Sequence, residues 1–153
     1  MSGVKIEIEL SGLDRVNEML NRIISNGNDL SPAMRQIGEH IQESTQDRFL
    51  SMISPDGSPW EPLSDTTLSL KKRKDRILTE EGILSGSINY QHSADSVIIG
   101  TPLEYGAIHQ LGGTTSASSM MPNKDIPARP FLGISESDED AIVDILKEHL
   151  SDI

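Results

Sequence analysis

The chain has 153 residues, the size of one compact domain, and we expect a single domain over residues 1–153. Its 24 acidic and 13 basic residues give a formal net charge of -11, which argues against sequence-specific or general binding to duplex nucleic acid. The absence of cysteine excludes disulfides, cysteine-ligated zinc and cysteine nucleophiles. The first residues lack the apolar segment of a signal peptide, and no apolar run is long enough to span a membrane, so we expect neither.

The N-terminal third predicts a strand and two helices. Alternating apolar and charged residues indicate a strand over residues 4–10, and apolar residues at three- and four-residue steps indicate an amphipathic helix over 13–24. Ser31, as an N-cap before a proline, is expected to open the longest helix, over 32–52. The apolar stripe of this helix comprises Met34, Ile37, Ile41, Thr45, Phe49 and Met52.

The middle of the chain predicts turns, short helices and a hairpin. Residues 54–59 are dense in turn-forming types. Ser64 is expected to cap a short helix that carries the basic residues of this region, and a second helical piece is expected over 80–84. Two alternating runs around a polar turn predict a β-hairpin over 87–100.

The C-terminal third predicts two helices separated by irregular chain. A short helix is expected over 102–110, followed by a mobile loop over 112–125, where no periodicity is visible. Residues 126–133, here called the proline-rich segment, contain too much proline for a central strand. Ser137 is expected to cap the last helix, whose acidic first turn suits the helix dipole and holds Asp138, Glu139 and Asp140. Its apolar stripe comprises Ile142, Val143, Leu146 and Leu150.

These elements together predict an α+β fold. We expect a small, mainly antiparallel sheet, made by the N-terminal strand and the 87–100 hairpin, packed by the long helix and the C-terminal helix.

The sequence shows no constellation typical of catalysis or metal binding. The four histidines are scattered, without the i, i+4 pairing of zinc-binding helices, and neither a phosphate-binding loop nor a nucleophile elbow occurs. We therefore expect no catalytic residues, no metal and no cofactor. A hydrolase built from His109, Asp56 and a serine is the alternative.

Three features are candidate contact sites. Residues 71–76, here called the basic run, form the one basic cluster of an acidic chain. They are expected either to face solvent or to contact DNA in a channel or an acidic partner, such as residues 135–140 of a neighbouring subunit. Trp60 is expected to cover an edge of the core or to anchor an interface. Arg129, held between prolines, is expected to pair with a carboxylate near the start of the last helix or across a subunit boundary, or else to face solvent.

Four stretches occur in a characteristic order. They are 49–64, with Pro55-Asp56-Gly57 and Pro59-Trp60, then 77–88, then 99–113, with Tyr105, His109 and Gln110, and finally the proline-rich segment. From about residue 30 onward, this order and spacing resemble the phage virion morphogenesis family, with its Mu-like morphogenesis and P2-like tail completion members. The chain departs from the family's usual Thr-Gly at Glu81-Gly82, so a basic contact at that point is not carried over.

The resemblance implies a structural virion assembly protein of a tailed phage or prophage, without enzymatic activity. Such a protein is expected to complete the tail, or to join tail and head, by forming a homo-oligomeric ring that docks on a tail ring. Its expected partners are phage tail or neck proteins, and its expected locations are the virion and, during assembly, the host cytoplasm. The alternative is an adaptor that binds DNA or an acidic partner through the basic run. The candidate interface residues are Trp60, Lys71, Lys72, Arg73, Lys74, Tyr105, His109, Gln110, Arg129 and Phe131.

Overall fold

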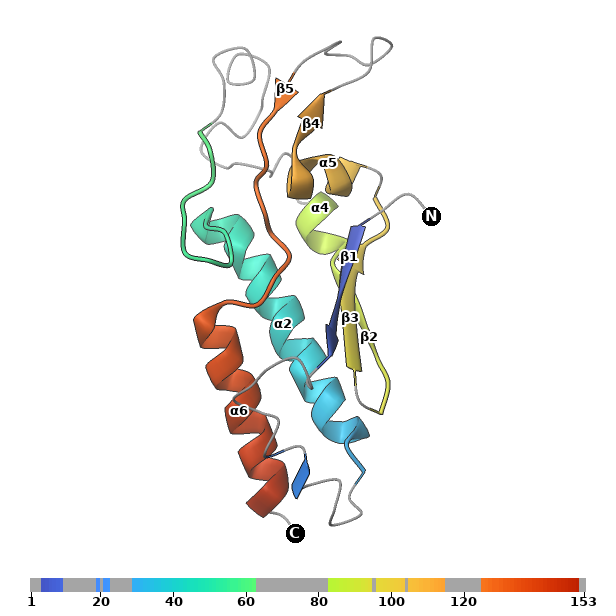
Figure 1. Ribbon diagram of the computed structural model, residues 1–153. Helices are drawn as coiled ribbons and strands as arrows, with labels where there is room; N and C mark the ends of the chain where they lie inside the picture. The colour runs from blue at the N-terminus through green and yellow to red at the C-terminus, as the bar shows by residue number, and fades with distance from the viewer. Residues whose placement is uncertain are drawn as a thin grey trace.

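Three layers are stacked in the computed structural model: a three-stranded sheet, helix α2 (Ser31–Ser51) on one face of it, and helix α6 (Glu136–Ser151) on the far side of α2 (Figure 1). The predicted α+β class is confirmed, although the C-terminal helix packs mainly on α2. The structure describes residues 4–9, 19, 21–22, 29–62, 83–94, 96–103, 105–114 and 125–151. Among these residues, no helix is both long and apolar enough to cross a membrane.

The sheet is antiparallel, with β3 (Ser96–Thr101) between β1 (Val4–Glu9) and β2 (Asn89–His92). The predicted N-terminal strand and hairpin are therefore confirmed. Ile6 and Tyr90 both lie opposite Ile99, so the three form one row across the sheet. Because side chains alternate between the two faces of a strand, this row and the buried Val97 share the face that packs on α2.

Helix α2 confirms the predicted long helix and its buried stripe, but not its predicted cap. Ser31 is the first helical residue, and its amide donates to Oδ1 of Asp29 at 3.0 Å, so the prediction that Ser31 is the N-cap is wrong. The helix ends at Ser51, and its C-cap Met52 takes the left-handed conformation with φ of 58°. The buried residues of its stripe are Met34, Ile37, Ile41, Thr45 and Phe49.

Helix α6 begins with a capping box that the sequence analysis misassigned. The hydroxyl of Ser135 accepts the amide of Asp138 at 3.0 Å, and the carboxylate of Asp138 accepts the amide of Ser135 at 3.0 Å. Ser137 lies inside the first turn, so its prediction as the cap is wrong. Ile142, Val143 and Leu146 are buried as predicted.

The remaining elements are short. The structure contains α4 (Ile83–Gly86) and α5 (Tyr105–Leu111), which confirm two predicted helical pieces. The ends of the predicted 112–125 loop instead pair as β4 (Gly113–Thr114) and β5 (Asp125–Ile126), because strands of two residues are too short to show alternation in a sequence. Residues 115–124, most of the predicted 13–24 helix and the predicted helix after Ser64 lie outside the described residues.

Helix α2 and the sheet approach each other closely at Gly38. A methyl group built on Gly38 would overlap the ring of Tyr90 on β2, so glycine is required here in spite of its low helix propensity. The ring of Tyr90 is partly buried against Gly38, and its hydroxyl is 3.5 Å from a carboxylate oxygen of the neighbouring residue Glu39.

We expect Gly38→Ala to lower the free energy of unfolding by about 1–3 kcal/mol, because the added methyl overpacks the helix–sheet contact. In a Tyr90→Ala background, the same substitution should become neutral, or stabilising by up to about 1 kcal/mol through helix propensity. Urea unfolding of the four proteins in this double-mutant cycle measures the coupling. Equal effects of Gly38→Ala in both backgrounds would contradict the assigned contact.

Candidate functional site

The proline-rich segment before α6 is held by side chains from distant parts of the chain. Nε1 of Trp60 donates to the carbonyl of Pro130 at 2.8 Å. The Gln110 side chain accepts the amides of Phe131 and Leu132, at 3.0 and 2.9 Å, and donates to the carbonyl of Leu132 at 3.0 Å. Buried backbone groups require hydrogen-bond partners, and these side chains supply the bonds that a neighbouring strand would supply in a sheet.

Arg129 connects the proline-rich segment to the chain that follows Trp60. Its guanidinium donates to the carbonyls of Glu61 at 2.7 Å and Pro62 at 3.0 Å, and its amide donates to the carbonyl of His109 at 2.7 Å. The prediction that Arg129 pairs with a carboxylate near the start of the last helix is wrong, because its guanidinium binds backbone carbonyls and the Asp138 carboxylate there is bound by a different arginine. With 6 % of Arg129 exposed, little of its side chain remains for a partner subunit.

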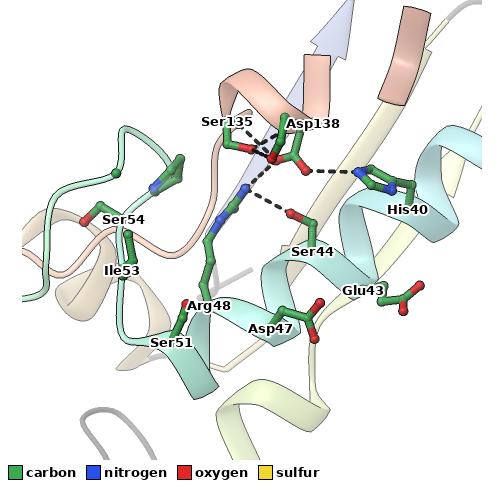
Figure 2. Close-up of a pocket in the computed structure, with 13 residues that line it drawn as sticks. His40, Glu43, Ser44, Asp47, Arg48, Ser51, Ile53, Ser54, Ser135 and Asp138 are labelled. Carbon is green, nitrogen blue, oxygen red and sulfur yellow. Dashed lines mark hydrogen bonds and ion pairs between the residues drawn. The ribbon is translucent and has the colours of Figure 1, made fainter. Parts of the chain in front are cut away.

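Arg48 is that other arginine, and it forms the buried centre of the site (Figure 2). Its guanidinium contacts a carboxylate oxygen of Asp138 at 2.5 Å and donates to the carbonyls of Phe131 and Gly133 at 2.8 and 3.1 Å. Arg48 is 6 % exposed and Asp138 is 1 % exposed. Arg48 was not among the predicted site residues, although it stands seven residues after Ile41 on the buried side of α2. A charged residue on an apolar stripe signals a buried partner.

The Asp138 carboxylate contacts three different groups, two from α2 and one from the residue before α6. One oxygen accepts from Arg48 and from the amide of Ser135, and the other lies 3.1 Å from Nε2 of His40 on α2 (Figure 2). Burial alone would raise the pKa of Asp138, but hydrogen bonds from Ser44 and Ser135 and the charge of Arg48 outweigh burial and hold that pKa below its usual range. The carboxylate therefore stays ionised and serves as a structural anchor.

An open pocket of about 480 Å³ lies beside this ion pair, between α2, the turn at 53–57 and the start of α6. Figure 2 shows Ser44, Arg48 and His40 directed from α2 towards Asp138, with Glu43 and Asp47 on the neighbouring side of the helix. The lining residues from α2 and the turn after it are His40, Glu43, Ser44, Asp47, Arg48, Ser51, Ile53, Ser54, Pro55 and Gly57. Those from the first turn of α6 and the residue before it are Ser135, Ser137 and Asp138.

The side chains that line this pocket are mostly charged or carry hydroxyl groups, so the pocket suits a polar or charged partner. Arg48 and Asp138 are engaged with each other and with backbone groups, which leaves neither poised as a base or nucleophile. In the part of the chain that the structure describes, no group of three His, Asp or Glu residues is placed to hold a metal ion.

The predicted contact residues from α5 and the proline-rich segment come together around one internal junction. Trp60 and Phe131 both pack on Phe49, with ring centroids 5.5 Å apart in each pair, and both are buried. Gln110 and His109 are partly buried on α5, which begins at Tyr105. The basic run, with Lys71, Lys72, Arg73 and Lys74, lies outside the described residues. The interface role of these residues stays a prediction.

His109 is the titratable group of this junction. Burial, and secondarily the positive charge of Arg129, lowers the pKa of His109 from its usual value of 6.5. The folded chain therefore favours neutral His109.

Comparison with known proteins assigns the chain to a family. The sequence profile of the phage virion morphogenesis family matches residues 12–151. The chain belongs to the phage virion morphogenesis family. The resemblance expected from the four stretches is thus confirmed. Three of them, 49–64, 99–113 and the proline-rich segment, meet at the junction of Trp60, Gln110 and Arg129.

Individual relatives agree with the family assignment. The chain is 34 % identical over 123 residues to protein G of Escherichia phage Mu, whose name assigns it provisionally to capsid assembly; the match covers 76 % of this chain and 77 % of that protein. It is 28 % identical over 145 residues to G protein 2 of the Mu-like prophage FluMu in Haemophilus influenzae, covering 94 % and 95 %. It is 26 % identical over 131 residues to tail completion protein S of Escherichia phage P2, covering 79 % and 87 %. No solved structure matches the chain at a significant level.

Substitution of the two arginines should separate their roles. We expect Arg48→Ala to lower the free energy of unfolding by about 3–5 kcal/mol, because it leaves the buried Asp138 carboxylate uncompensated. Arg129→Ala should cost about 1–3 kcal/mol, because it strands two neutral carbonyls. Lysine at either position should recover part of the loss. Chemical unfolding measures all four variants; a cost of Arg48→Ala below that of Arg129→Ala would refute the ranking.

The low pKa of His109 predicts a specific pH dependence. As the pH falls through 6.5, the unfolded chain takes up a proton at His109 before the folded chain does, so folding stability is lost. Between pH 7.5 and 5.5, wild type should therefore lose more stability in urea than His109→Gln. His92→Gln, at an exposed position of β2, is the matched control and should behave as wild type. Parallel losses in wild type and His109→Gln would contradict the prediction.

Proposed function

We propose that this family member is a non-enzymatic virion assembly protein that completes the phage tail or joins the tail to the head. The observation that carries the proposal is the family match over residues 12–151, together with relatives named for capsid assembly and tail completion. The shared stretches support a structural role, because their polar side chains bind the backbone of the proline-rich segment.

Absence of enzymatic activity is part of the proposal. The most buried charged groups, Arg48, Arg129 and Asp138, are engaged in structural bonds. Asp56, the acid of the alternative hydrolase, lies in an exposed turn, where its carboxylate accepts the amide of Ser58 at 2.9 Å. A catalytic acid or base needs a position matched to a substrate pocket, which an exposed turn does not provide. Screens with ester and nucleic-acid substrates would expose a hydrolase.

The proposed mode of action is assembly of several copies into a ring that docks on a tail ring, with tail or neck proteins as partners and the virion as final location. A chain of net charge -11 repels its own copies at long range, so we infer a weak, concentration-dependent oligomer in solution. Binding of several copies to one tail surface would raise their effective concentration and stabilise the oligomer.

The competing function is an adaptor that holds DNA through the basic run. It is favoured by one observation, which is that five of the 13 basic residues lie within residues 71–76. Binding to DNA that weakens steeply with salt, and that is lost when these residues are replaced by serine, would favour this function over tail completion.

Loss of the protein should stop virion assembly at a stage that defines its role. In phage particles made without it, we expect electron microscopy to show either free heads beside tails of normal length, which indicates a joining role, or tails of uncontrolled length, which indicates a terminating role. A wild-type copy supplied in trans is the control and should restore joined particles. Infectious particles of normal form without the protein would overturn the proposed function.

A further inference from the structure

One exposed face of the molecule, along α2 and α6, is strongly acidic. On α2, Glu39, Glu43 and Asp47 are exposed at four-residue spacing and form one row along the helix. On α6, Ser137 lines the pocket together with Glu43 and Asp47. The exposed Asp144 stands seven residues after Ser137, so it lies on the same side of α6 as Ser137. We call Glu39, Glu43, Asp47 and Asp144 the acidic face.

This row does not stabilise its own helix. Carboxylates at i and i+4 repel each other, so the arrangement of Glu39, Glu43 and Asp47 opposes helix formation. The two helices hold nine acidic residues, three in α2 and six in α6, against three basic ones, Arg35, Arg48 and Lys147. Arg48 is buried on Asp138, so Arg35 and Lys147 are the exposed cations that these two helices themselves carry.

The balancing positive charge is concentrated elsewhere in the sequence. Five of the 13 basic residues occupy residues 71–76, between Pro62, whose carbonyl Arg129 holds, and α4, which starts at Ile83. The acidic helices and the basic run are therefore separate, oppositely charged parts of one chain. Between two copies of net charge -11, contact of the acidic face with the basic run brings opposite charges together while the bulk of each copy repels the other.

We propose that the acidic face on α2 and α6 is the docking surface for the basic run of a second copy of this chain. This inference rests on the proposed ring and specifies its subunit contact. Each copy contributes the acidic face to one neighbour and a different segment, the basic run, to the other, so the proposed contact is head-to-tail. Head-to-tail contacts generate closed rings when the rotation between copies closes, which two-fold contacts do not.

Charge reversal on each side of the contact tests the proposal. One variant, Glu43→Lys with Asp47→Lys, makes the acceptor face basic; the other, Lys71→Glu with Lys72→Glu and Lys74→Glu, makes the run acidic. Each variant alone should associate at least about tenfold more weakly than wild type in light scattering and sedimentation, since like charges then meet. An equimolar mixture should recover association, because each reversed surface finds a complementary one on the other variant.

The possible outcomes separate this proposal from the proposed function. Recovery in the mixture supports the contact and cannot arise from a bond within one chain. Wild-type association that neither variant weakens overturns the contact and leaves ring formation by another surface standing. If each variant associates more weakly than wild type and the mixture does not recover association, the contact between copies is overturned. The basic run then acts on its own chain or on another partner. A wild type that stays monomeric at every accessible concentration overturns both the contact and the ring.

A matched control excludes a general effect of net charge. Glu7→Lys with Asn89→Lys and Gln91→Lys raises the net charge by four, as Glu43→Lys with Asp47→Lys does, at exposed positions of the sheet. This control should associate at least as well as wild type, and its dissociation would overturn the proposal. Thermal unfolding verifies that every variant is folded.

The salt concentration should also change the association of the wild type. Association should be strongest at about 0.15 M salt, because lower salt extends the repulsion between copies and much higher salt screens the contact itself.

Discussion

The buried ion pair of Arg48 and Asp138 is the interaction on which the other contacts depend. Two charges removed from water are costly, and this cost is offset only when the remaining donors and acceptors are satisfied. Here the guanidinium also binds the carbonyls of Phe131 and Gly133, and the carboxylate also caps the first turn of α6 through Ser135. The pair therefore fixes, at one point, the position of α6 on α2 and the path of the chain that leads into α6.

The second constraint is the backbone of the proline-rich segment, which cannot be satisfied by a continuous sheet ladder. Pro127 and Pro130 have no amide proton to donate, and only the first residue of the segment pairs, in β5. Side chains from elsewhere in the chain supply the missing bonds: Trp60 and Gln110, from two other stretches of the family pattern, and Arg48 of α2. Three of the family stretches, which are far apart in sequence, are thus held together at one junction.

The sequence predicted elements through periodicity and failed where periodicity carries no information. Strand β1, the β2–β3 hairpin and α2 each contain enough residues to repeat an alternating or helical pattern. Caps were misplaced because several capping residues stand together: Asp29 precedes Ser31, and Ser135 precedes Ser137, and only the reciprocal bond to Asp138 decides the second case. Partners of Arg48 and Arg129 were hidden, because most are backbone carbonyls, which every residue possesses and no residue type signals.

The distribution of aromatic residues bears on how such a protein assembles. Three of the five aromatic side chains, Phe49, Trp60 and Phe131, form one internal cluster that supports the junction. Aromatic residues often contribute most of the binding energy in tight interfaces, but these three are buried inside the subunit. In the ring that we propose, contacts between copies draw on the acidic face and the basic run, and charged contacts give fast, reversible and salt-sensitive association. Such association suits the proposed role, in which the copies stay dispersed until a tail presents the surface on which they collect.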